Sequence, residues 1–77
     1  MQVKILGSGC RKCVALADNT RAALDHLGQD AEIVKVTDVA QIAAHGVMST
    51  PALVIDGKVV STGKVLAASE IEALLRH

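Results

Sequence analysis

The segment Thr50-Pro51-Ala52-Leu53-Val54-Ile55-Asp56-Gly57-Lys58-Val59-Val60 predicts a β-hairpin that begins with the only proline of the chain. Asp-Gly between two apolar, β-branched runs favours a two-residue turn, because both turn positions adopt a positive φ. A proline is tolerated at the first residue of a strand, where its missing N–H is not needed for the sheet. We therefore expect strands over residues 52–55 and 58–62.

Upstream of the hairpin, the apolar pattern predicts a strand, a long helix, a second strand and a short helix. The first strand covers residues 2–6, and apolar residues spaced three and four apart predict a helix from Cys10 that Gly28 ends. A strand over residues 31–36 follows, and Thr37 or Asp38 caps a second helix that closes near residues 45–46. The residues expected to face inward from this second helix are Val39, Ile42 and Ala43. Met48, a few residues later, could offer partners a soft apolar contact, but we expect it to pack in the core.

Downstream of the hairpin, residues 67–76 predict a last helix that turns Ile71, Leu74 and Leu75 inward. The resulting order is β-α-β-α-β-β-α, and its first strand-helix-strand unit implies a parallel pair with a right-handed crossover. Four strands in a mixed sheet, with helices on both faces, bury all the apolar faces. The chain of 77 residues contains no repeat or linker, so we expect one α/β domain over residues 1–77.

The composition argues against several classes of partner. Eight acidic and eight basic side chains give a formal net charge of zero, and no residue is aromatic. Nucleic acids and anionic membranes select a basic excess, and single-stranded bases stack on aromatic rings. No apolar run reaches the ~18 to 20 residues that cross a bilayer, and the N-terminus lacks the apolar region of a signal peptide. We therefore expect a cytoplasmic monomer that binds neither nucleic acid nor membrane.

The two cysteines lie where the first strand passes into the first helix, in the order Cys10-Arg11-Lys12-Cys13. Side chains at positions i and i+3 of a helix face each other, so a disulfide can form without moving the backbone. The free N–H groups of the helix start, together with Arg11 and Lys12, favour a thiolate at Cys10. Cys10 is then the nucleophile, and Cys13, on the buried stripe, is the thiol that resolves the mixed disulfide.

Other interpretations of the cysteine pair are weaker. A closed structural metal site needs four ligands, and the chain has neither a second cysteine pair nor histidines at ligand spacing. Two thiolates suffice to carry a soft metal such as copper(I) or mercury(II), so this alternative stays open. A two-residue spacing between cysteines beside a βαβ pattern nevertheless favours redox chemistry.

The segment before the hairpin is the second candidate for a functional role. From the residues alone, the cis and trans forms of the Thr50-Pro51 bond both remain open. In the cis form, the backbone carbonyl and N–H of Thr50 would turn outward beside the thiols. An extended substrate segment could then add to them like a short strand.

Two motifs together resemble a known family. They are Gly9-Cys10-Arg11-Lys12-Cys13 after the first strand, and the segment over residues 46–60 that contains Thr50-Pro51. Over essentially its whole length the chain is similar to the small thioredoxin-like redox-active disulfide proteins of prokaryotes, in the thioredoxin and glutaredoxin superfamily. The resemblance implies a thioredoxin-like three-layer α/β/α sandwich, dithiol-disulfide exchange by Cys10 and Cys13, and a cis Thr50-Pro51 bond that faces them.

This resemblance also implies a function. We expect a thiol-disulfide oxidoreductase that reduces protein disulfides, docks the substrate backbone at Thr50 and Pro51, and needs no metal or organic cofactor. A thioredoxin-reductase-like flavoenzyme is the expected electron donor. Larger thioredoxins place a buried carboxylate six residues before the first cysteine as a proton acceptor, and this chain has Lys4 there. The soft-metal alternative resembles the heavy-metal-associated domains, whose order is βαββαβ.

Overall fold

The computed structural model describes residues 1–76 and contains the seven elements expected from the sequence, in the expected order. The strands are β1 (Gln2–Leu6), β2 (Glu32–Val36), β3 (Ala52–Ile55) and β4 (Lys58–Thr62). The helices are α1 (Arg11–Leu27), α2 (Val39–Ala44) and α3 (Ala68–Leu75). The β-α-β-α-β-β-α order is thus confirmed. Within the described residues, none of the three helices has the length and apolar character needed to cross a membrane.

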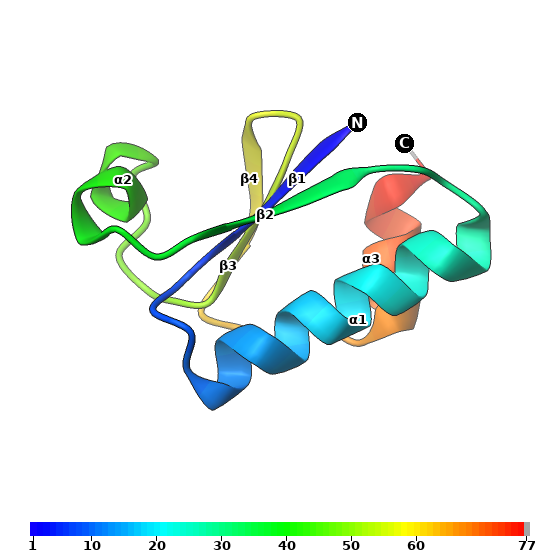
Figure 1. Ribbon diagram of the computed structural model, residues 1–77, viewed down its shortest axis with the longest axis horizontal. Helices are drawn as coiled ribbons and strands as arrows, with labels where there is room; N and C mark the ends of the chain where they lie inside the picture. The colour runs from blue at the N-terminus through cyan, green and yellow to red at the C-terminus, as the bar shows by residue number, and fades with distance from the viewer. Residues whose placement is uncertain (77) are drawn as a thin grey trace.

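One four-stranded mixed sheet organises the fold, in the order β2-β1-β3-β4. β1 and β2 are parallel because α1 connects them as a crossover, whereas β1 with β3 and β3 with β4 are antiparallel. Asp56 and Gly57 both have a positive φ and form the predicted two-residue turn between β3 and β4. Figure 1 shows α1 and α3 lying together beside the sheet, with α2 at the sheet's other end.

Apolar residues form a cluster on each face of the sheet, because successive residues of a strand point to opposite sides. The cluster against α1 and α3 includes Val3, Ile5, Leu16, Leu53 and Ile71. The cluster on the opposite face includes Leu6, Val36, Ala52 and Val54, which pack with Ile42 of α2 and with Val47. Helices therefore cover both faces, in agreement with the expected three-layer sandwich.

Three predictions about burial near α2 are wrong. Ile42 is buried as expected, but Val39 is 78% exposed, Ala43 is also exposed, and Met48 is 99% exposed. The helix has only six residues, fewer than two turns, so it presents a single side chain to the sheet. Val47 takes the core position that follows the helix, which leaves the adjacent Met48 side chain on the outside.

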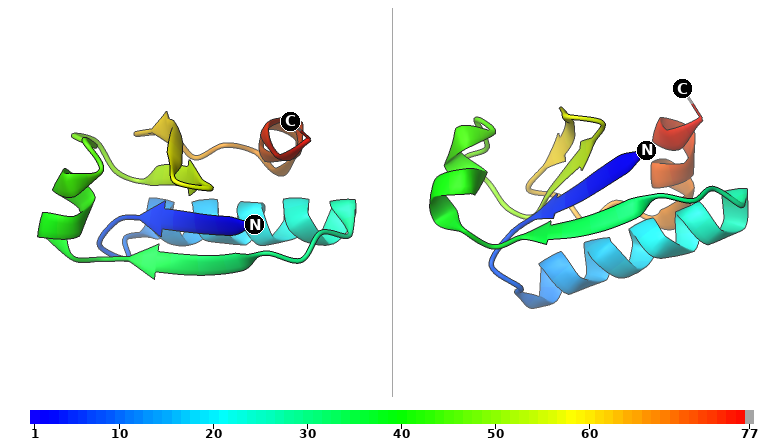
Figure 2. Two further views of the ribbon diagram at one scale, coloured as in Figure 1. Left: turned by 90° about the horizontal axis from the view of Figure 1, so that it is seen from above. Right: turned by 45° about the horizontal axis from the view of Figure 1, so that its top comes forward.

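The strand register brings two distant segments to one end of the sheet. In the antiparallel pair of β1 and β3, Leu6 lies opposite Ala52. Residues 7–10, which follow β1, therefore lie beside residues 49–51, which precede β3. In both views of Figure 2, the blue segment between β1 and α1 and the yellow-green segment before β3 lie at the end of the sheet near α2. This end of the sheet holds the cysteines.

Candidate active site

Cys10 occupies the N-cap position of α1, and its side chain is exposed. Its Sγ accepts a hydrogen bond from the backbone N–H of Cys13 over 3.4 Å. A helix start leaves such N–H groups without partners inside the helix, so a cap side chain satisfies one of them. The Sγ atoms of Cys10 and Cys13 lie 2.7 Å apart. The spacing of the two cysteines thus puts one thiol in direct contact with the other.

The two thiols differ in their readiness to ionise. Cys13 is 4% exposed. Burial raises the pKa of the Cys13 thiol, and its contact with Cys10 raises it further. The side-chain hydrogen bond from Cys13 lowers the pKa of Cys10, and the backbone N–H groups of Cys13 and Lys12 add to this effect. Of the two thiols, the exposed Cys10 therefore loses its proton more readily, and the buried Cys13 holds its proton more strongly.

The charged residues between the cysteines contribute less than the sequence suggested. The side chains of Arg11 and Lys12 are exposed, and water screens exposed charges strongly. It is the backbone N–H of Lys12, rather than its ammonium group, that lowers the pKa of Cys10. The helix start and the neighbouring thiol thus stabilise the thiolate.

Gly7 leaves the space that Cys13 occupies, a role that the sequence analysis did not assign. Gly7 follows β1, is buried, and donates its N–H to the carbonyl oxygen of Val36 over 2.9 Å. A Cβ atom at this position would overlap Cys13 Sγ and would lie 3.8 Å from the Cβ of Thr50. Cys13 and Thr50 therefore both lie beside the position that a side chain at Gly7 would occupy. The only signal in the sequence is a glycine directly after a strand.

The bond between Thr50 and Pro51 is cis, as the resemblance implies. Pro51 is fully buried, whereas Thr50 is exposed. The N–H of Gly63, after β4, donates to the carbonyl oxygen of Pro51 over 2.8 Å. Hydrogen bonding to Gly63 and burial of Pro51 hold this segment in place, with Thr50 and Cys13 both beside Gly7. The structure thus brings all four candidate site residues to one end of the sheet.

A small hollow of about 40 Å³ adjoins the buried thiol. Its lining residues are Ile5, Gly7, Gly9, Cys13, Val14 and Lys35, of which Lys35 carries the charge. Lys4 occupies the position of the carboxylate in larger thioredoxins, yet it pairs in register with Val34 and Val54. Both valines pack on the α2 side. Lys4 therefore lies on the opposite face of the sheet from this hollow.

A groove of about 300 Å³ extends from the site towards α2. Its lining residues are Ser8, Thr37, Val39, Ile42, Ala43, Val47, Met48 and Thr50. Ser8 and Thr50 belong to the two segments that meet beside the thiols, and most of the other lining residues are apolar. The exposed side chains of Val39 and Met48 belong to this groove. An apolar surface thus begins at the candidate docking residue Thr50.

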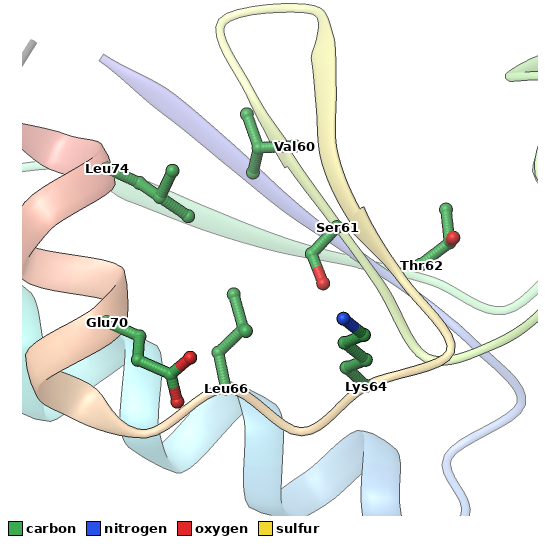
Figure 3. A pocket seen from close by; sticks show the side chains of 7 residues that line it. All are labelled: Val60, Ser61, Thr62, Lys64, Leu66, Glu70 and Leu74. Atoms are coloured by element: carbon green, nitrogen blue, oxygen red, sulfur yellow. The ribbon is translucent and has the colours of Figure 1, made fainter.

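A larger hollow of about 450 Å³, between β4 and α3, is unrelated to the thiols (Figure 3). Its lining residues are Val60, Ser61, Thr62, Lys64, Leu66, Glu70 and Leu74. Glu70 has a structural partner, because its Oε1 accepts the N–H of Ala67 over 3.1 Å and caps α3. The hollow contains no cysteine, and we assign it no part in the site.

The described residues contain no group of three or more His, Cys, Asp or Glu side chains arranged to hold a metal ion. His26 pairs with Glu72 over 2.7 Å, and His45 contacts the carbonyl oxygen of Gln41 over 2.8 Å. The element order also differs from the βαββαβ order of the heavy-metal-associated domains. The arrangement is suited to thiol-disulfide exchange between the two sulfurs.

Comparison with known proteins identifies the family. The family model of the thioredoxin domain matches residues 1–76. The chain is 43% identical over 74 residues to a thioredoxin of Methanocaldococcus jannaschii, covering 96% of this chain and 85% of the relative. It is 37% identical over 75 residues to a thioredoxin of Methanothermobacter thermautotrophicus, covering 97% of each chain. Because these matches span nearly its whole length, the chain belongs to the thioredoxin family and is a thiol-disulfide oxidoreductase.

Proposed function

We propose that this enzyme reduces disulfides of other proteins with Cys10 and Cys13, while Thr50 and Pro51 dock the substrate backbone. The observation that carries the proposal is the contact between an exposed thiol of lowered pKa and a buried thiol of raised pKa. An exposed thiolate is ready to attack a substrate disulfide. A buried thiol stays protonated until the first attack has occurred.

The reaction has two steps. The Cys10 thiolate attacks one sulfur of the substrate disulfide, whose S–S bond breaks, and the other substrate sulfur leaves and takes a proton from water. The product is a mixed disulfide on Cys10. Cys13 then loses its proton to solvent and attacks the Cys10 sulfur, so that the Cys10–Cys13 disulfide forms and the second substrate sulfur leaves and is protonated. The substrate gains two electrons, and the cysteine pair loses them.

Docking of the substrate is assigned to the exposed Thr50 and to the groove beside it. Thr50 and Cys13 both lie beside Gly7. An extended substrate segment that pairs with the backbone at Thr50 would present its disulfide to Cys10. Neighbouring apolar side chains of the same segment would then contact the groove walls at Val39 and Met48. We infer that the main partners are proteins that carry an accessible disulfide.

Turnover requires a second partner that reduces the Cys10–Cys13 disulfide again. We assign this role to a thioredoxin-reductase-like flavoenzyme, in keeping with membership of the thioredoxin family. The cytoplasm keeps thiols reduced, and it is the compartment in which this cycle is proposed to run. The formal net charge of zero supports neither nucleic acid nor an anionic membrane as a partner.

The reduction of insulin disulfides by dithiothreitol, with this protein in catalytic amounts, tests the proposal. The wild-type protein should accelerate the reaction, and Cys10→Ser should lower the rate to the uncatalysed background. In a separate reaction without dithiothreitol, reduced Cys13→Ser should stop after the first step and retain the substrate as a mixed disulfide on Cys10, visible by non-reducing electrophoresis. Ser69→Ala, at an exposed position of α3, is the matched control and should keep the wild-type rate. Wild-type turnover by Cys10→Ser would refute the assignment.

The same preparations test carriage of a soft metal by the cysteine pair. Reduced protein is titrated with copper(I) in the presence of a competing thiol, beside the insulin assay. Weak uptake together with insulin reduction would support the oxidoreductase. Tight, stoichiometric uptake by a protein that fails to reduce insulin would support the carrier instead.

A further inference from the structure

Met48 projects from a segment that is fixed on both sides. Val47 is buried in the cluster beneath α2, and Pro51 is fully buried at the start of β3. The side chain of Met48 is nevertheless 99% exposed. Because its neighbours hold the backbone, this exposure is a property of the fold and not of a loose chain end.

Met48 is also close to the docking residue. It precedes Thr50 by two positions, and both residues line the groove that begins beside the thiols. The unbranched thioether adapts to apolar surfaces of different shape. In a groove that must accept different protein substrates, Met48 therefore supplies an adaptable apolar contact.

The thioether of an exposed methionine is open to oxidation. A peroxide transfers one oxygen atom to the sulfur, which becomes a sulfoxide, and the peroxide becomes water or an alcohol. The sulfur loses two electrons, and the peroxide gains them. The product is polar, so it no longer favours contact with apolar side chains. Methionine sulfoxide reductases reverse the change.

We propose that Met48 is an oxidation site whose sulfoxide weakens the docking of protein substrates and leaves the thiol chemistry unchanged. This inference rests on the proposed function, because it concerns the surface on which a substrate protein would dock. The groove that Met48 lines includes neither cysteine. Oxidation of Met48 thus changes the affinity for large substrates and not the reactivity of Cys10.

The chain contains one other methionine, which provides an internal control. Met1 is 48% exposed, and its carbonyl oxygen accepts the N–H of Glu32. It precedes β1, whereas the thiols follow β1, so Met1 lies at the opposite end of the sheet from the docking residues. In a Met48→Leu variant, peroxide can oxidise only Met1, so this variant reports the effect of oxidation away from the groove.

The experiment first protects the thiols as the Cys10–Cys13 disulfide and then exposes the protein to hydrogen peroxide. Dithiothreitol afterwards reduces the disulfide but leaves the sulfoxide, which mass spectrometry locates in the peptides. For the oxidised wild-type protein, the KM for insulin should rise about three- to tenfold, as expected for loss of a partly buried apolar contact, with little change in kcat. The reduction rate of a small aromatic disulfide should not change. Treatment with methionine sulfoxide reductase should restore the KM.

The Met48→Leu variant completes the test. Peroxide treatment should not change the KM of this variant for insulin, whatever the KM of the untreated variant is. An equal rise in KM for Met48→Leu and wild type after peroxide treatment would overturn the inference. So would an equal loss of rate by the oxidised wild-type protein with insulin and with the small disulfide. An unchanged KM in wild-type protein whose Met48 is fully oxidised would also overturn it, and the proposed function would still stand. Only failure of the untreated wild-type protein to reduce insulin would remove the proposed function itself.

Discussion

Cys10 and Cys13 carry the same side chain, yet one helix start gives them opposite pKa shifts. Cys10 caps the helix from outside and accepts hydrogen bonds there, whereas Cys13 lies one turn inside and is buried. The position of each sulfur relative to the helix therefore separates their chemistry. The thiol of Cys13 donates a hydrogen bond directly to the Cys10 sulfur. Removal of this thiol should therefore raise the pKa of Cys10 more than removal of a nearby charge would.

The Cys13→Ala variant removes the largest contribution that lowers the pKa of Cys10, so this pKa should rise towards its ordinary value. The rate of Cys10 alkylation by iodoacetamide, measured against pH, should shift to higher pH, and the rate at neutral pH should fall. Cys13→Ser retains a hydroxyl donor and should shift less. Lys12→Met keeps the backbone N–H that contributes and should leave the curve nearly unchanged. A shift as large in Lys12→Met as in Cys13→Ala would contradict this account.

At the scale of the elements, the sequence predicts correctly those features that depend on residues close together in the chain. The Asp56-Gly57 turn and the long apolar stripe of α1 each specify their own conformation, and both predictions are confirmed. The orientation of α2 was predicted wrongly for Val39, because six residues make too few turns to define an inward face. Gly7 was missed because its role depends on the register that sets Leu6 opposite Ala52, a pairing between residues far apart in the chain.

The cap of α2 gives a prediction at this scale. Asp38 Oδ1 accepts the N–H groups of Ala40 and Gln41 over 2.7 and 3.3 Å. Asp38→Ala should lower the free energy of unfolding by about 1 kcal/mol, measured by urea denaturation. The KM for insulin should also rise, because α2 forms one wall of the groove. Asp18→Ala, at an exposed position inside α1, is the control. Equal loss of stability in both variants would show that the loss in Asp38→Ala does not come from the cap hydrogen bonds.

At the scale of the whole molecule, the chain has little stability to lose. Its radius of gyration of 11.2 Å fits the about 11.5 Å expected for a compact domain of this length. The folded chain exposes 4620 Å², so it buries only about 60% of the surface of the unfolded chain. With no aromatic residue, the buried side chains are aliphatic and each contributes limited area. Domains of this size are stabilised by about 4 to 12 kcal/mol, so single core residues matter.

Substitution of Leu53 should remove a large part of the small free energy of unfolding. It is fully buried in β3, an inner strand of the sheet, and packs in the cluster beneath α1 and α3. Leu53→Ala should therefore lower the free energy of unfolding by about 2 to 5 kcal/mol, a large part of the total. Val65→Ala, at a partly exposed loop position, should change it by less than about 0.5 kcal/mol. Because the chain has no aromatic fluorophore, far-UV circular dichroism in urea is the suitable measurement. Equal midpoints for the two variants would contradict this account, because the buried Leu53 side chain would then contribute no more to stability than a partly exposed side chain in a loop.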